Sequence, residues 1–249
     1  MQCSTLTEQA RHWAHSQPDQ VWMRDLNDAG AVEYTWRGAI DQIDRVAAWL
    51  ETEFGHGERM ALLSRNRAHW VMADMAVIHS GNVTVPLFTT HAQATAEYIL
   101  EFTDTKALFL GETENWESVK RVLPIDCLLI TLPGVDCDLP HKKWEELIAA
   151  APLNAPKYQP AADDIVSLVF TSGTTGLPKG VIQTHATNLI PMRRCQYLFT
   201  QREQPRWFSY LPLSHIAERQ IAEFSSINTG GEIWFNESLE TLEIGRAHV

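Results

Sequence analysis

Short apolar segments alternate with segments of helical periodicity along most of this chain, and this rhythm narrows the choice of fold. The apolar residues 60–63 are followed by a helical pattern over Ala68–His79 and then by the β-branched segment Val83–Leu87. Strands that are apolar throughout are typical of parallel sheets covered on both faces. The sequence therefore predicts an α/β fold with largely parallel sheets and flanking helices. In such folds the loops after the strands share one edge, where ligands usually bind.

The same patterns predict the remaining elements. Residues 21–24 and 32–35 form a hairpin whose turn contains Gly30, and Thr35 caps a helix that Gly55 ends. Further strands are expected at 107–110, 127–131, 165–170, 181–183, 207–210 and 232–235. Further helices are expected at 6–14, 91–102, 116–122, 142–151, 186–199 and 216–227.

Composition excludes several classes of protein. The chain has 249 residues with 45% apolar and 20% charged residues, as in globular proteins, and a net charge of -11. That charge argues against general nucleic-acid binding, because phosphate backbones attract basic surfaces. No segment approaches the ~18 consecutive apolar residues of a membrane span, and no secretory signal is evident, so the expected location is the cytoplasm, with peripheral membrane contact left open. The cysteines lack metal-site spacing and are expected to be free thiols: Cys3, Cys127, Cys137 and Cys195.

One loop concentrates polar chemistry directly after an apolar strand. Residues 170–180 read Phe-Thr-Ser-Gly-Thr-Thr-Gly-Leu-Pro-Lys-Gly. Glycines let backbone N–H groups approach a ligand closely, the hydroxyls add donors, and Lys179 supplies a compact positive charge. This set of groups suits a polyphosphate.

Two other interpretations of this loop are weaker. A Walker A motif has glycine directly before its lysine, whereas Pro178 precedes Lys179, so a P-loop kinase or GTPase is disfavoured. A flexible linker would need neither the lysine nor strands on both sides.

Several segments resemble one family. Residues 171–180 resemble the signature of the AMP-binding, adenylate-forming superfamily, and 210–219, Tyr-Leu-Pro-Leu-Ser-His-Ile-Ala-Glu-Arg, resemble its long-chain fatty-acid CoA ligases. Residues 34–36 and 230–241 are similar to the same subgroup. The resemblance implies that 1–242 form an incomplete N-terminal AMP-binding domain of an adenylate-forming enzyme, without its C-terminal domain. It also implies a fatty acid, ATP and CoA as substrates, with Mg²⁺ on the phosphates.

The resemblance also assigns roles to residues. Thr171 would offer its hydroxyl to the magnesium ion, Lys179 would offset the charge of the departing pyrophosphate, and His215 would lie near the acyl carboxylate. The β- and γ-phosphates would be held by Thr171, Ser172, Gly173, Thr174, Thr175, Gly176 and Lys179.

Local alternatives exist for individual side chains. His215 can be a histidine at a helix N-terminus, with Ser214 as the cap. Glu218 and Arg219 are adjacent in sequence, so they do not face one another on a helix. His185 lacks a metal-ligating partner at helical spacing and is expected in a turn or at the surface.

The end of the sequence departs from the family. Residues 243–249, Glu-Ile-Gly-Arg-Ala-His-Val, resemble a translated sequencing adapter and are expected to be a non-native tail. Lacking the family's later segments, the chain alone is expected to be inactive. Two other functions stay open: an adenylating ligase for shorter, aromatic or amino acids, and a non-catalytic nucleotide- or acyl-binding module.

Overall fold

The computed structural model describes residues 3–27, 30–150, 156–171, 177–199 and 205–236, and two β-sheets organise this part of the chain. The larger sheet has seven strands in the order β7-β6-β5-β3-β4-β8-β9. All neighbours run parallel except β8 and β9. The strands are β3 (Arg59–Leu63), β4 (Val83–Leu87), β5 (Ala107–Leu110), β6 (Leu128–Thr131), β7 (Lys142–Lys143), β8 (Ile165–Thr171) and β9 (Lys179–Thr184).

The smaller sheet joins the two ends of the described chain. Its four strands have the order β10-β11-β1-β2. The predicted hairpin of β1 and β2 is present, and β1 also pairs in parallel with β11, so that Met23 lies opposite Ile233. The strands are β1 (Val21–Asn27), β2 (Gly30–Thr35), β10 (Arg206–Ser209) and β11 (Glu232–Phe235). The expected α/β fold with largely parallel sheets is confirmed.

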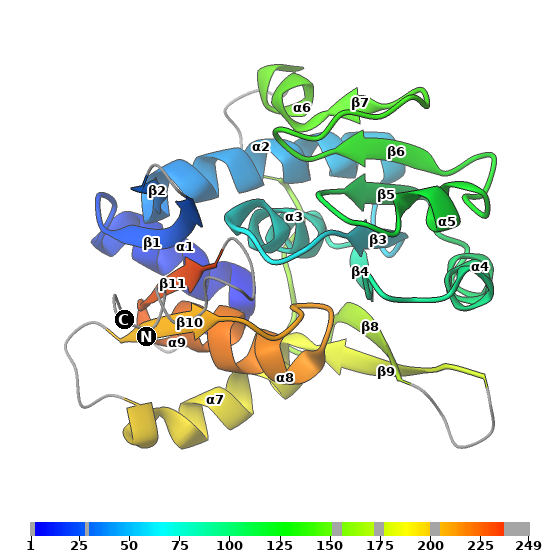
Figure 1. Ribbon diagram of the computed structural model, residues 1–249. Coiled ribbons are helices and arrows are strands. Elements are labelled where there is room, and N and C mark those ends of the chain that lie inside the picture. The colour runs from blue at the N-terminus through cyan, green and yellow to red at the C-terminus, as the bar shows by residue number, and fades with distance from the viewer. Residues whose placement is uncertain (1–2, 28–29, 151–155, 172–176, 200–204, 237–249) are drawn as a thin grey trace.

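Helices cover both sheets (Figure 1). They are α1 (Leu6–Ser16), α2 (Trp36–Phe54), α3 (Ala68–His79), α4 (Gln93–Phe102), α5 (Trp116–Lys120), α6 (Trp144–Ala150), α7 (His185–Phe199), α8 (Ile216–Glu218) and α9 (Ser225–Thr229), with a π-helical segment Arg219–Phe224 between the last two. Thr35 caps α2 by accepting a hydrogen bond from Gly38 N at 3.2 Å, and Gly55 ends it with a φ of 75°. Both boundaries agree with the prediction.

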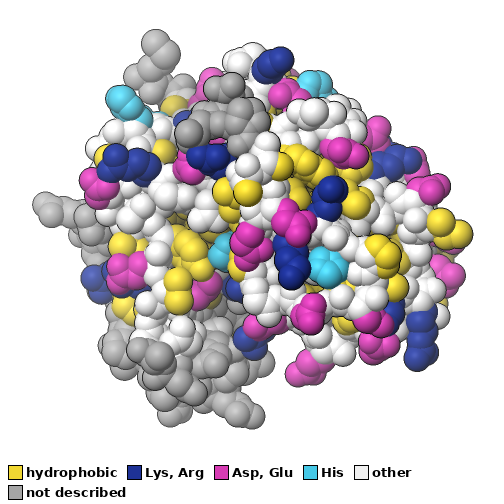
Figure 2. All heavy atoms as spheres, turned by 90° about the horizontal axis from the view of Figure 1, so that it is seen from above, with side chains coloured by type: hydrophobic (Ala, Val, Ile, Leu, Met, Phe, Trp, Pro, Cys, Tyr) yellow, Lys and Arg dark blue, Asp and Glu magenta, His cyan; other side chains and the backbone are white. Residues whose placement is uncertain are grey.

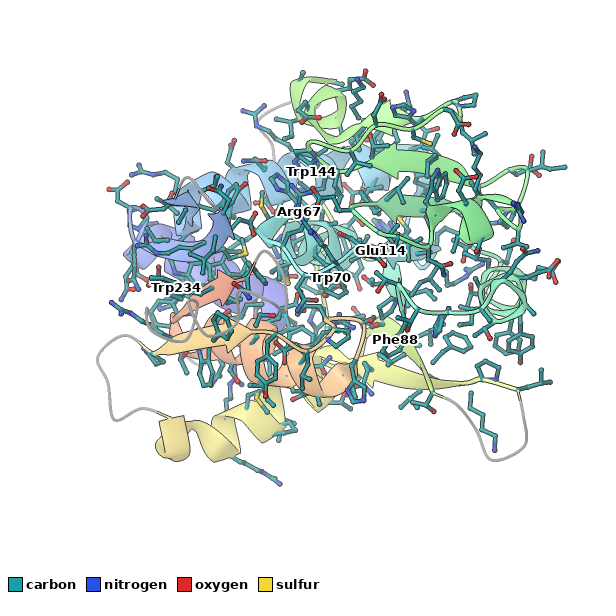
Figure 3. All side chains as sticks on the ribbon, in the orientation of Figure 1. Arg67, Trp70, Phe88, Glu114, Trp144 and Trp234 are labelled. Carbon is teal, nitrogen blue, oxygen red and sulfur yellow. The ribbon has the colours of Figure 1, made fainter. Side chains whose placement is uncertain are left out.

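Helix α3 lies in the middle of the molecule, between the two sheets (Figure 1). All its residues are buried, and all except His69, Asp74 and His79 are apolar, which is typical of a central helix. The core around it is rich in tryptophan. Trp22 stacks on Trp36 with ring centroids 4.1 Å apart, and Trp70, which Figure 3 labels, is fully buried.

Several predicted bounds are off by one or two residues, and two predicted helices differ more clearly from the structure. The helix expected at 142–151 begins only at Trp144, because Lys142 and Lys143 pair with β6 at the sheet edge. The single helix expected at 216–227 is divided into α8, the π-helical segment and α9. Within the π-helical segment the buried residues include the charged Arg219 and Glu223, which a prediction from apolar periodicity does not detect.

The surface mixes charges of both signs. On the face in Figure 2, acidic side chains lie among basic ones, with small groups of hydrophobic side chains between them. In the ranges that the structure describes, no helix combines the length and apolar character needed to cross a membrane.

Candidate functional site

A cleft of about 750 Å³ opens where the carboxyl ends of strands from both sheets meet. Residues 64–66 follow β3, 89 and 90 follow β4, 112–114 follow β5, and Ser209, Tyr210 and Ser214 come from the end of β10 and the loop after it. Figure 3 labels Phe88 and Glu114, which belong to the segments after β4 and β5. In parallel α/β sheets this edge is where ligands bind.

Thr171 and Lys179 face each other across the hairpin of β8 and β9. They are the last pair of the antiparallel ladder, and both are exposed. Their neighbours Phe170 and Gly180 form the preceding pair, and a Cβ atom on Gly180 would lie 3.2 Å from the Phe170 ring, so glycine permits this close packing. The predicted phosphate-binding residues between the strands lie outside the described residues: Ser172, Gly173, Thr174, Thr175 and Gly176.

The end of β8 lies at the same edge of the sheet as the cleft. Strands β4 and β8 run parallel, with Thr84 opposite Ser167, and the Ser167 hydroxyl donates to Thr84 O at 2.9 Å. Thr171 is therefore as far beyond Ser167 as Phe88 is beyond Thr84. The ring of Phe88 meets His215 edge to face, with centroids 6.3 Å apart. The structure thus brings the three described candidate residues, Thr171, Lys179 and His215, to one edge.

His215 caps helix α8. Its Nδ1 accepts a hydrogen bond from Ala217 N at 3.1 Å, and its side chain is exposed. The prediction that Ser214 is the cap is wrong, because His215 itself has the extended backbone of a capping residue and Ser214 is buried beside the cleft. Because Nδ1 accepts, the neutral ring carries its proton on Nε2, which remains available as a donor.

The loop between β10 and α8 is held from two sides. Asn66 donates from Nδ2 to Ser209 Oγ at 2.9 Å and to Leu211 O at 2.6 Å, and its Oδ1 accepts from Leu213 N at 2.8 Å. Glu218 accepts from Tyr210 N at 3.1 Å on the other side. Sequence reasoning missed Asn66. The signal that could have found it is a polar segment directly after the buried strand β3.

Arg219 has buried carboxylate partners rather than its neighbour Glu218. Its Nη2 lies 2.5 Å from Asp74 Oδ2, its Nε 3.3 Å from Glu223 Oε2, and its Nη1 donates to Ser167 Oγ at 2.8 Å. The side chains of Asp74, Arg219 and Glu223 have no exposed surface. Burial raises the pKa of Glu223 well above its usual value, and the charge of Asp74 raises it further.

Other histidines occupy structural positions. His185 is buried, contrary to the expectation of a turn or surface position, and its Nδ1 accepts from Leu6 N at 3.1 Å because α7 packs beside the start of α1. No cluster of three or more His, Cys, Asp or Glu residues that could hold a metal occurs within the described ranges.

Comparison with known proteins identifies the family. A family model described as AMP-binding enzyme matches residues 10–247. Fatty acyl-CoA synthetase A of Dictyostelium discoideum is 29% identical over 234 residues, 86% of this chain and 34% of the relative. Long chain acyl-CoA synthetase 6, peroxisomal, of Arabidopsis thaliana is 29% identical over 175 residues, 66% of this chain and 25% of the relative. The chain spans about a quarter to a third of the length of these relatives.

Solved structures agree on the fold. Acetoacetyl-CoA synthetase from Streptomyces lividans matches 94% of this chain and 39% of its own, with a TM-score of 0.82 and 21% identity. The fatty acyl-adenylate ligase from L. pneumophila, in complex with acyl adenylate and pyrophosphate, matches 99% of this chain and 42% of its own, with a TM-score of 0.78 and 19% identity. Such low identities show the fold alone. The family model covers nearly the whole sequence, and the chain therefore belongs to the AMP-binding enzyme family.

Proposed function

We propose that this chain is the part of an acyl-CoA synthetase that binds ATP and positions a long-chain fatty acid for adenylation. The fatty-acid carboxylate attacks the α-phosphorus of ATP, and the bond to pyrophosphate breaks. The thiolate of CoA then attacks the carbonyl carbon of the acyl-adenylate, and AMP leaves. Support comes from the family, from relatives named as fatty acyl-CoA synthetases, and from the segment 210–219 at the cleft.

The observation that carries the proposal is the pairing of Thr171 with Lys179 at the end of the β8–β9 hairpin. A rigid ladder fixes a hydroxyl and an ammonium group at the two ends of the intervening loop. The hydroxyl and backbone N–H groups of residues 171–176 bind the β- and γ-phosphates. Lys179 stabilises the negative charge that develops on departing pyrophosphate.

The residues at this site suit a Mg²⁺ ion that is bound together with the nucleotide. Magnesium in such sites is commonly bound by one or two protein oxygens together with substrate phosphates. Thr171 offers one neutral oxygen at the hairpin end, next to the proposed phosphate site. When bound, the ion neutralises phosphate charge, while Thr171 and Lys179 keep the triphosphate in place.

The loop after β10 supplies the part of the site that we assign to the carboxylate of the fatty acid. Tyr210 and Ser214 line the cleft, and His215 stands at its rim against Phe88. Nε2 of His215 is the free donor, so we assign it to a carboxylate oxygen of the fatty acid or its adenylate. Lys179 and His215 are thus the two residues proposed to act on the reacting groups.

Catalysis is proposed to need the further length that the relatives have. The matched part is about a third of fatty acyl-CoA synthetase A. On this proposal residues 1–242 are part of the N-terminal domain, and the 249-residue chain alone forms no acyl-CoA.

Carboxylate-dependent exchange of pyrophosphate into ATP tests the function. The whole protein that contains this sequence should catalyse magnesium-dependent exchange most efficiently with long-chain fatty acids. A preference for short, aromatic or amino acids would replace the substrate and keep the reaction. Nucleotide binding without exchange for any acid would instead support a non-catalytic binding module.

A further inference from the structure

The side-chain amide of Asn66 makes three hydrogen bonds, all of them to the loop between β10 and α8. Both hydrogens of Nδ2 are donated to the segment 209–211, and Oδ1 accepts from Leu213 N. These partners lie more than 140 residues away in sequence. The opposite orientation of the amide is excluded, because Leu211 O can only accept and Leu213 N can only donate.

We infer that Asn66 is a positioning residue that fixes the loop between β10 and α8 at the rim of the cleft, so that Tyr210, Ser214 and His215 meet the acyl carboxylate. The inference rests on the proposed function. Asn66 follows β3, the central strand of the larger sheet, whereas the loop extends from the smaller sheet. The side chain therefore ties the two sheets together at the cleft itself.

The far side of the loop is fixed independently. Glu218 accepts from Tyr210 N at 3.1 Å, and His215 N donates to Pro212 O at 2.9 Å. Removing Asn66 leaves these contacts in place, so the loop loses its anchor to the larger sheet without losing its own turn. The expected result is a displaced or looser loop rather than an unfolded one.

The proposed phosphate site does not depend on Asn66. Thr171 and Lys179 are positioned by the β8–β9 ladder, whereas the Asn66 amide bonds, among the described residues, to Ser209, Leu211 and Leu213. Loss of Asn66 should therefore affect the carboxylic acid and leave the affinity for ATP unchanged. A purely structural residue would lower both together.

The chain contains a matched control. Asn82 has the same three kinds of contact: it accepts from Glu58 N at 2.9 Å and donates to Gly55 O at 3.1 Å and Ser80 Oγ at 2.9 Å. It lies at the opposite end of β3, just before β4 begins. Asn82→Ala removes an equivalent anchor without touching the cleft.

Hydrogen exchange on the 249-residue chain tests the anchor. Asn66→Ala should lower the protection of the Leu213 amide on the order of tenfold. Asn66→Asp keeps the acceptor and should retain that protection, while the lost donors loosen residues 209–211. Asn82→Ala should leave 209–213 unchanged. Unaltered protection of Leu213 in Asn66→Ala overturns the inference, and if this variant does not fold, unaltered exchange of 209–211 in Asn66→Asp does so.

Kinetics of the whole protein test the consequence. Asn66→Ala should lower kcat/KM for the carboxylic acid on the order of tenfold to a hundredfold, with the KM for ATP unchanged and no such loss in Asn82→Ala. A looser loop with unaltered kinetics overturns the positioning role and leaves the proposed function standing. Absence of pyrophosphate exchange in the unmodified protein counts against the proposed function, whereas the exchange of Leu213 still reports on the anchor.

Discussion

Arg219 Nη1 donates to the Ser167 hydroxyl at 2.8 Å, and this bond connects the segment after His215 to the strand that leads to Thr171. Ser167 in turn donates to Thr84 O in β4. The two segments that carry the proposed site are thus joined through the protein interior. Their relative position depends on a buried charge that has no access to water.

We expect Arg219→Met to destabilise the protein by about 3–5 kcal/mol, because it leaves the buried carboxylate of Asp74 without its cation. Urea unfolding followed by circular dichroism measures the change. Ser167→Ala is the control, since it removes only one neutral hydroxyl partner of Arg219 and should cost less, about 1.5–3 kcal/mol. Equal losses for the two variants would contradict the importance of the charge.

Glu223→Gln should remove a pH dependence of the protein's stability. Burial and Asp74 raise the pKa of Glu223, so the folded protein keeps a proton that the unfolded chain loses above its usual pKa of about 4.5. Stability is therefore complete below that value and falls as pH rises toward the folded pKa. Glutamine keeps an oxygen for Arg219 and offers an N–H to Asp74, whose Oδ1 has no other partner among the described residues.

The Glu223→Gln variant should be as stable as the unmodified protein at low pH and more stable at about pH 8. Urea midpoints across that range measure it, with the exposed Glu97→Gln as control. A loss of stability with rising pH that is as steep as in the unmodified protein, or steeper, would show that the pKa of Glu223 is not raised in the fold.

Local patterns predicted most of the elements, and the reason is physical. Strand Val83–Leu87 and helix Ala68–His79 are buried along their whole length, so apolar residues dominate both segments, and their predicted bounds agree with the structure. Lys142 and Lys143 carry no such signal. They pair with β6 at an edge, where the backbone ladder rather than side-chain burial decides the conformation.

Long-range relationships were not predictable in this way. The division into two sheets depends on pairs such as Met23 with Ile233, which no local period encodes. The motif of residues 171–180 indicated a phosphate site by its composition. Asn66 bonds to the loop after β10, and Arg219 bonds to the strand that leads to Thr171. Both contacts cross the fold, so only the structure reveals them.

His185→Asn should make the protein more resistant to acid. Burial lowers the pKa of His185 to about 4, so between that value and its usual 6.5 the unfolded chain binds a proton that the folded protein does not. Stability is therefore lost as pH falls through this window, by up to about 1.4 kcal/mol per pH unit for one such group. Asparagine does not titrate, and its Oδ1 can replace Nδ1 as the acceptor for Leu6 N.

Urea midpoints at about pH 7 and about pH 5 measure how steeply stability changes with pH. The substitution of an exposed histidine, His15→Asn, serves as control. The slope should decrease without vanishing, because the pKa values of buried His69 and His79 are also lowered. If stability depends on pH equally steeply in His185→Asn and in the unmodified protein, His185 does not contribute to the loss of stability in acid.

Lys179→Ala should slow adenylation on the order of a hundredfold, since the ammonium group is proposed to stabilise pyrophosphate as it departs. Carboxylate-dependent pyrophosphate exchange in the whole protein measures the rate. Stability should change by less than about 0.5 kcal/mol because Lys179 is exposed at the end of a ladder.

Two further variants serve as controls. Lys143 is also an exposed lysine and lies on the opposite edge strand β7, so Lys143→Ala should leave the exchange rate unchanged. Lys179→Arg should recover only part of the rate, because the planar guanidinium keeps the charge but not the compact geometry of the ammonium group. An exchange rate in Lys179→Ala equal to that of Lys143→Ala would remove Lys179 from the reaction.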